Sequence, residues 1–325
     1  MFTNQIIFLI ATFILTAILG KIIIPILKKL KVGQSERAEG PRAHLKKQGT
    51  PTMGGIMMII SIIIMTIIYC VFFSETQENI VQILAVAIAS IGFGIVGFID
   101  DFKKVILKNT EGLNPKLKMF GLLIISVIYT MFLVNYVNIG TDIIIPFINY
   151  NLNLPLWIFI PFTILVMLSA TNAVNLTDGV DGLAGSVSAI MITAISIIAI
   201  KLEFIGISVY GAILVGCCAG FLIYNFHKAK VMMGDTGSLL LGGVISSMMI
   251  YLKLPLLLIL IAIVPVIETL SVILQVLYFK KTGNRLFRMS PLHHHFELTG
   301  WRENRVVAVF SLITFIASTI AIFAI

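Results

Sequence analysis

Ten long apolar stretches take up most of this sequence, and they restrict it to one class of fold. A helix needs about 20 apolar residues to cross the hydrocarbon core of a bilayer. Ile, Leu, Phe and Met fill the stretches without the alternation of a barrel strand, which favours helices. Charged residues make up 12% of the 325 positions, well below the roughly 25% of soluble domains. The stretches lie at 5–27, 54–73, 80–99, 119–138, 156–173, 183–200, 205–224, 238–252, 255–279 and 306–325.

The pattern predicts an all-α fold: a polytopic integral membrane protein of about ten transmembrane helices. No connector is long enough for a soluble domain, so we expect a single transmembrane domain over residues 1–325.

Basic residues lie almost entirely in the odd-numbered connectors between these stretches. The even-numbered connectors hold only Lys201 and Lys253. Because cytoplasmic loops carry the excess of Lys and Arg, the odd connectors are predicted to be cytoplasmic, and ten helices then place both termini on the extracytoplasmic side. The net charge of +8 is therefore concentrated on one face, where it favours anionic lipid headgroups and anionic substrates. No nucleic acid is expected as a partner, because no basic patch with interleaved aromatic residues stands outside the membrane.

The same division sorts the other reactive side chains. All five histidines fall in the odd connectors. Five of the six aspartates do the same, and only Asp142 lies on the other side. The five are Asp100, Asp101, Asp178, Asp181 and Asp235. This clustering predicts a site built from several cytoplasmic loops.

The segment "GFIDDFKKV", residues 97–105, ends a helix with two adjacent carboxylates, Asp100 and Asp101, followed by Lys103 and Lys104. A divalent cation is a common way to hold adjacent acids together. The alternative is an ordinary helix end whose acids are balanced by the lysines. The nearby "GFGIVG", residues 92–97, matches a dinucleotide-binding pattern but lies inside an apolar helix, so we interpret it as helix packing.

The segment "NAVNLTDGVDGLAG", residues 172–185, joins two apolar stretches and contains no Lys or Arg. Asn172, Asn175, Asp178 and Asp181 recur every three residues, which on a helical turn directs them to one side. Two acids without a basic neighbour indicate a cation or a ligand rich in hydrogen-bond donors. The alternative is a simple polar turn.

The segment "MGDTGSLLLGG", residues 233–243, places Asp235 just before an apolar helix. A helix start of this kind is either an anion site or a simple cap. In "SPLHHHFELTGWRE", residues 290–303, three consecutive histidines cannot all face one ion, and donation to phosphates suits the neighbouring arginines better than zinc. Glu268, beside Pro265 in the ninth stretch, is an intramembrane carboxylate: a functional candidate, or one member of a buried pair.

Taken in order, "GTPTMGG", "GFIDDFKK", "NAVNLTDGVDGLA", "MGDTGSLLLGG" and "PLHHHFELTGW" resemble the phospho-N-acetylmuramoyl-pentapeptide-transferase family, part of the wider polyprenyl-phosphate N-acetylhexosamine-1-phosphate transferase superfamily. The resemblance runs from about residue 40 to residue 325. It implies transfer of phospho-MurNAc-pentapeptide from UDP-MurNAc-pentapeptide to undecaprenyl phosphate, giving lipid I and UMP, with Mg²⁺ as cofactor. It also implies a multi-pass protein of the bacterial cell membrane whose active site faces the cytoplasm. A homodimer is an expectation from the resemblance alone.

The resemblance also assigns residues. It implies catalytic roles for Asp100, Asp101, Lys104, Asp235 and His294. It implies Asp235 and Asp101 as metal ligands. It implies substrate binding by Lys47, Lys116, Asn172, Asn175, Asp178, Asp181, Asn225, Met232, His293 and His295. Met232 stands where many relatives have phenylalanine, a difference that concerns one stacking contact with the uracil.

The chemistry of the lipid phosphate predicts different roles for the three acids. The second pKa of a phosphate monoester is near 6, so undecaprenyl phosphate is largely dianionic at neutral pH and hardly needs a strong base. We therefore expect Asp100 to orient the lipid phosphate or deprotonate its residual monoanion, while Asp101 and Asp235 serve the metal. The lipid must enter from the bilayer, and a groove near the bent ninth helix, around Pro265 and Glu268, is the predicted place for its tail.

Two other classes of protein fit the sequence less well. A transporter of polyprenyl phosphate or nucleotide sugars would place polar groups near the bilayer midplane in paired repeats. Here the acids lie at one face and the sequence shows no convincing repeat. An isoprenoid transferase would carry a second acid-rich motif after the "DD" pair, which this sequence does not have.

Overall fold

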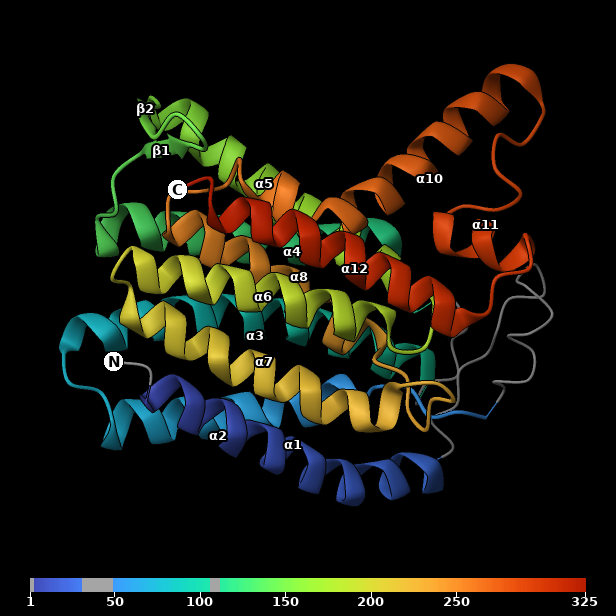
Figure 1. Cartoon of the computed structure of the whole chain (residues 1–325), viewed down its shortest axis with the longest axis horizontal. Helices are drawn as coiled ribbons and strands as arrows, with labels where there is room; N and C mark the ends of the chain where they lie inside the picture. Colours follow the sequence, from blue (N-terminus) through green and yellow to red (C-terminus); the bar gives the residue numbers. More distant parts are fainter. Residues whose placement is uncertain (1–2, 31–48, 106–111) are drawn as a thin grey trace.

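The computed structural model describes residues 3–30, 49–105 and 112–325 (Figure 1). Helices dominate this part of the chain. They are α1 Thr3–Lys29, α2 Gly55–Phe72, α3 Gln77–Val105, α4 Pro115–Phe132, α5 Leu156–Thr177, α6 Leu183–Lys201, α7 Ile205–Asn225, α8 Gly234–Tyr251, α9 Leu258–Ile261, α10 Ile263–Thr282, α11 Leu292–Leu298 and α12 Glu303–Ile322. A π-helical turn, η2 Leu133–Val137, continues α4.

The long helices fall on the ten predicted apolar stretches. By length and composition, nine helices in the described residues are able to cross a membrane. The tenth long helix is α8, which has 18 residues and carries Asp235 in its first turn. Glycine and serine are frequent in it. The predicted polytopic all-α fold is therefore confirmed.

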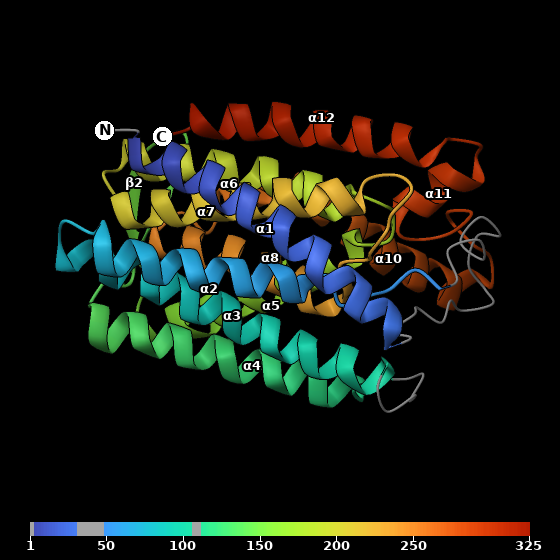
Figure 2. The same cartoon turned by 90° about the horizontal axis from the view of Figure 1, so that it is seen from below.

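Helix α8 lies in the middle of the bundle in both views (Figures 1 and 2). It packs against α3 and α5, and small residues allow the close approach. A Cβ atom at Gly97 of α3 would overlap the backbone carbonyl of Asp235, and one at Gly55 of α2 would overlap the backbone of Gly237. The glycines of "GFGIVG" thus serve helix packing, as predicted.

The ninth apolar stretch bends where α9 ends and α10 begins. Ala262, between the two helices, has φ −93° and ψ 31°, outside the helical region. Pro265 lies in the first turn of α10, where its missing N–H costs no helical hydrogen bond. From this break α10 leans away from the other helices (Figure 1).

A β-hairpin, missing from the all-α prediction, lies between α4 and α5. Strands β1 Asp142–Ile145 and β2 Tyr150–Asn153 pair antiparallel, with Asp142 opposite Asn153. Lys253 Nζ lies 2.7 Å from Asp142 Oδ1, and the Lys253 carbonyl accepts from Ile144. Two of the charged residues predicted for the extracytoplasmic connectors, Asp142 and Lys253, thus form an ion pair.

The hairpin marks one end of the bundle. The start of α1 and the end of α12 lie at this end, and α11 lies at the other (Figures 1 and 2). A chain with an even number of crossings has both termini at the same end of the bundle. Which end faces the cytoplasm stays a prediction.

Candidate functional site

Three predicted aspartates come together where α3 ends and α8 begins. Asp100 and Asp101 belong to the last turns of α3, and Asp235 to the first turn of α8. Each offers one carboxylate oxygen, and these oxygens lie within 4.8 Å of one another. The glycine contact between Gly97 and the Asp235 backbone, one turn before Asp100, holds the two helix ends at this separation.

Asp101 holds the start of α8. Its Oδ1 accepts from the Asp235 backbone N–H at 3.1 Å, and its Oδ2 accepts from the N–H and the hydroxyl of Thr236 at 2.9 and 2.6 Å. A carboxylate that accepts from the free N–H groups of a helix start acts as its cap. Both oxygens of Asp101 are therefore engaged by the protein.

Asp235 is surrounded by donors from three helices. Its Oδ2 lies 2.8 Å from Lys104 Nζ and 2.9 Å from Lys118 Nζ. Its Oδ1 accepts from Asn175 Nδ2 at 2.7 Å. Lys104 also pairs with Asp100, whose Oδ1 accepts from the Leu113 N–H at 2.7 Å. The arrangement is a compact cluster of acids, lysines and one amide.

Lys118 is the residue of this cluster that the sequence did not indicate. The predicted residue was Lys116, which is exposed. Asn114 caps α4 by accepting from the Lys116 N–H at 3.0 Å, and Pro115 occupies the first turn. This start fixes which lysine of "PKLK" faces α3. The Asn114 cap and the helical period were the sequence signals that could have indicated Lys118.

The last turn of α5 contributes Asn175 to the site, and the residue that follows the helix contributes Asp178. Asn175 Nδ2 also donates to Ser238 at 2.8 Å. Asp178 is half-buried, and its carboxylate accepts from the Gly234 N–H. Burial raises the pKa of Asp178 well above its usual range, and the charge of Asp235 adds to this. Asn172 points elsewhere, because its amide donates to the Leu168 carbonyl one turn back at 2.7 Å.

Asp181 and Asn225 shape the backbone beside this loop. Asn225 accepts from the Gly182 N–H at 3.0 Å and donates to the Val231 carbonyl at 2.9 Å. Asp181 accepts from the Ala229 N–H at 3.0 Å. A second group of ligand-type atoms forms there, from Asp181, His227 and Glu303.

Met232 ties the loop before α8 to the segment before α2. Its N–H donates to the Pro51 carbonyl at 2.8 Å, and its carbonyl accepts from the Gly54 N–H at 2.9 Å. The Gly55 N–H donates to the Met233 carbonyl at 3.0 Å. The two segments are thus paired like strands. Lys47, predicted to bind substrate, lies outside the described residues.

The three consecutive histidines have three different surroundings. His293 is buried, with Nδ1 at 3.3 Å from Glu268 Oε2. Its ring meets Gly179, where a Cβ would overlap Nε2. The other two histidines turn to Glu297 and to the Arg288 backbone: His294 Nδ1 lies 2.8 Å from Glu297 Oε2, and His295 Nδ1 accepts from the Arg288 N–H. The histidines do not converge on one ion, in keeping with the sequence argument.

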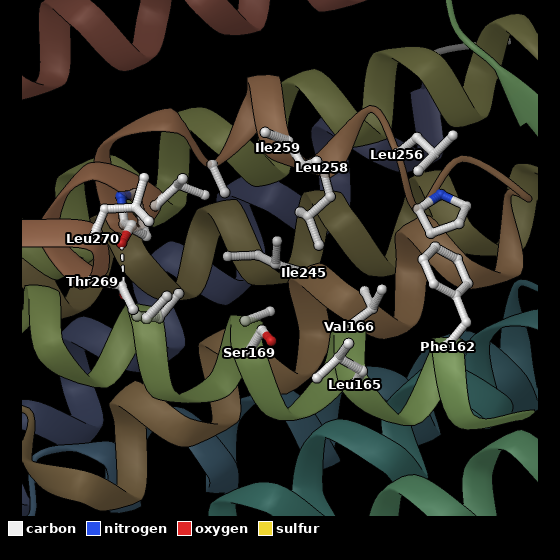
Figure 3. A pocket seen from close by; sticks show the side chains of 17 residues that line it. Phe162, Leu165, Val166, Ser169, Ile245, Leu256, Leu258, Ile259, Thr269 and Leu270 are labelled. Carbon is white, nitrogen blue, oxygen red and sulfur yellow. Dashed lines mark hydrogen bonds between the residues drawn. The ribbon is translucent and has the colours of Figure 1, made fainter. Parts of the chain in front are cut away.

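An apolar cavity of about 290 Å³ lies between α5, α8 and the α9–α10 bend (Figure 3). Its lining includes Phe162, Leu165, Ile245, Ile259 and Leu270. The polar lining residues are Ser169 and Thr269, and Thr269 donates to its own helix at Pro265. Such a space suits a hydrocarbon chain better than a polar ligand.

Comparison with known proteins gives one consistent result. Residues 83–253 match the family described as glycosyl transferase family 4. A Halalkalibacterium halodurans protein is 45% identical over 97% of this chain and 95% of its own length. Proteins of Clostridium perfringens strain 13 and Bacillus subtilis strain 168 are 48% and 47% identical, over 96% and 92% of this chain and 96% and 90% of their own lengths. All three carry the name phospho-N-acetylmuramoyl-pentapeptide-transferase.

Proposed function

The chain belongs to the phospho-N-acetylmuramoyl-pentapeptide-transferase family, and we propose on this basis that it moves phospho-MurNAc-pentapeptide from UDP-MurNAc-pentapeptide to undecaprenyl phosphate. The products are lipid I, for peptidoglycan synthesis, and UMP. The proposal rests above all on identities of 45–48% over nearly the whole chain. The protein is a multi-pass membrane protein. We further propose that it resides in the bacterial cell membrane with the α3–α8 site facing the cytoplasm.

The acid and lysine cluster suits this chemistry. In the reaction a phosphate oxygen of the lipid attacks the phosphorus that carries MurNAc, and the bond to UMP breaks. Two anionic groups must meet, so positioning and charge stabilisation dominate catalysis. Lys104 and Lys118 offer two ammonium groups at one point of the site. We assign them to the phosphates of the two substrates.

Asp235 and Asp101 are the residues proposed to hold Mg²⁺, and Asp100 lies next to them. All three offer carboxylate oxygens, the ligands that hard divalent cations prefer. When bound, Mg²⁺ would supply positive charge next to the diphosphate. Asp101 has a second contribution, because its oxygens accept three hydrogen bonds from the start of α8. Its contribution is to hold the Asp235 backbone in place.

The proposed place of the uridine diphosphate is at the end of α5 and in the loop after it, with the residues Asn175, Asp178, Asp181, Asn225 and Met232. His294 and His295 lie on the neighbouring α11 and are assigned to the phosphates. Lys116 and Asn172 face away from the cluster, so any contact with substrate from these two residues is to its outlying parts.

The cavity at the α9–α10 bend is the proposed place of the polyprenyl tail. It is apolar, and Pro265 of α10 is part of its lining. Glu268, predicted with Pro265 to mark the groove, is buried against His293. Ala170→Phe should fill the cavity, raising the KM for polyprenyl phosphate while the KM for the nucleotide stays the same. Ala308→Phe, on the exposed side of α12, is the matched control.

One assay tests the activity itself. The purified protein in detergent should release UMP from UDP-MurNAc-pentapeptide only when polyprenyl phosphate and a divalent cation are present. A transporter would bind the substrates and release no UMP. No UMP from wild-type protein that binds UDP-MurNAc-pentapeptide would contradict the proposal.

A further inference from the structure

Two lysines share a single carboxylate oxygen at the centre of the site. Asp235 Oδ2 lies 2.8 Å from Lys104 Nζ and 2.9 Å from Lys118 Nζ. The other oxygen, Oδ1, accepts from Asn175 Nδ2 at 2.7 Å. Both carboxylate oxygens of Asp235 are therefore already engaged by protein donors.

A divalent cation and these lysines compete for the same oxygen. A cation bound to Asp235 Oδ2 would stand about 2.0 to 2.6 Å from it, in the space that the ammonium groups occupy. Like charges at this distance repel each other. Binding of a cation through Asp235 therefore requires at least one ammonium group to move.

Lys118 has fewer contacts to lose than Lys104. Lys104 extends from α3 one turn beyond Asp100 and pairs with both Asp100 and Asp235. Lys118 reaches across from α4, and its Nζ is 4.0 Å from Asp100 Oδ2, beyond hydrogen-bond distance. Asp235 is thus its one close partner among the described acids.

We propose that Lys118 is the exchangeable counter-ion of Asp235. It neutralises this carboxylate until a divalent cation takes its place, and its ammonium group then turns to the phosphates of the nucleotide. This rests on the proposed function, which brings a cation and a diphosphate to the same cluster. In this exchange the charge of the Asp235 carboxylate is balanced by Lys118 before the cation binds and by the cation afterwards.

The test measures metal affinity. Mn²⁺ binding to the purified protein, without nucleotide, is followed by the loss of its free EPR signal. Lys118→Met should bind Mn²⁺ at least about fivefold more tightly than wild type, the lower end of typical coupling between sites. Lys118→Arg keeps the charge and should restore wild-type affinity. With nucleotide present, Lys118→Met should raise the KM for UDP-MurNAc-pentapeptide.

Lys116→Met is the matched control, because it removes the same charge from the same turn of α4 at an exposed position. The effect of an exposed charge is largely screened in about 0.15 M salt, so Mn²⁺ affinity should stay near wild type. Equal affinities for Lys118→Met and wild type, or equal gains for both variants, would overturn the exchange. If Asp235→Asn binds Mn²⁺ as wild type does, the metal assignment is overturned and the exchange with it. UMP release by the wild type tests the transferase activity separately.

Discussion

Glu268 and His293 face each other inside the protein, with His293 Nδ1 at 3.3 Å from Glu268 Oε2. Both side chains are 1% exposed. Glu268 Oε1 also accepts from the His293 backbone N–H at 3.2 Å. Because the imidazole packs against Gly179, this pair connects α10, which lines the apolar cavity, with the loop of Asp178. The glutamate therefore fixes the position of the histidine.

Glu268→Gln should lower kcat by up to about 100-fold, the loss that a misplacement of about 1 Å in a positioned group can cause, with little change in the KM for the nucleotide. The glutamine keeps the size of the side chain but not its charge. Ser271→Ala is the control, because it removes a buried hydrogen bond to the Glu268 carbonyl on the same helix. The measurement is steady-state UMP release. Full activity in Glu268→Gln would show that the pair is only structural.

Asp235→Asn should lose activity that excess Mg²⁺ partly restores, because the substitution weakens a ligand without removing the site. Asp100→Asn should lose less at high pH, where the lipid phosphate is already dianionic since its second pKa is near 6. UMP release over a grid of pH and Mg²⁺ distinguishes the two variants. Equal losses, independent of pH and metal, would contradict this division of labour.

Gly97→Ala should reduce activity strongly, because its Cβ would overlap the Asp235 carbonyl and push α3 from α8. Backbone contacts of this kind cannot relax by side-chain rotation, and overpacking costs about 1 to 3 kcal/mol. Gly92→Ala in the same motif is the comparison, since its Cβ would meet only the Ile125 side chain at 3.1 Å. Thermal unfolding and UMP release are measured on both. Equal tolerance of the two substitutions would argue against the close packing at Gly97.

Asp178→Asn should stabilise the substrate-free protein at neutral pH. The raised pKa of Asp178 means that the folded protein holds a proton over a range above the ordinary value of 3.8. The stability from this group is present at low pH and is lost as the pH rises through the raised pKa. The asparagine abolishes that loss, so the melting temperature should exceed that of wild type at pH 8, and the difference should shrink toward pH 5. A difference that does not change with pH would contradict this cause.

The helices could be predicted because an apolar stretch of the right length has one main solution in a bilayer. The hairpin could not, because Asp142–Asn153 contains too few residues for a clear alternation, and its position depends on Lys253 and the last residues of the chain. Phe147, between the strands, donates to the Ala324 carbonyl at 2.8 Å. Contacts between distant segments of this kind are not written in local sequence.

The site shows the same limit at the level of single side chains. Composition and motif order indicated which loops meet, and phosphate chemistry predicted different roles for Asp100 and its neighbour Asp101, but neither gave the contacts of these two side chains. In the structure the two adjacent acids have different partners. Asp100 pairs with Lys104, and Asp101 accepts from the Thr236 N–H. The three-residue spacing likewise grouped Asn172 with Asn175, while the helix directs only Asn175 to Asp235.

The strand-like pairing of Pro51 and Gly54 with Met232 has a consequence for hydrogen exchange. Loop amides usually exchange quickly with solvent, whereas these N–H groups are engaged by backbone carbonyls of another segment. Their deuterium uptake should be as slow as that of the helices. Since no side chain makes these bonds, substitutions of the side chains on either segment should leave the pairing intact. The two segments should therefore move together, and a ligand bound by one segment should restrain both.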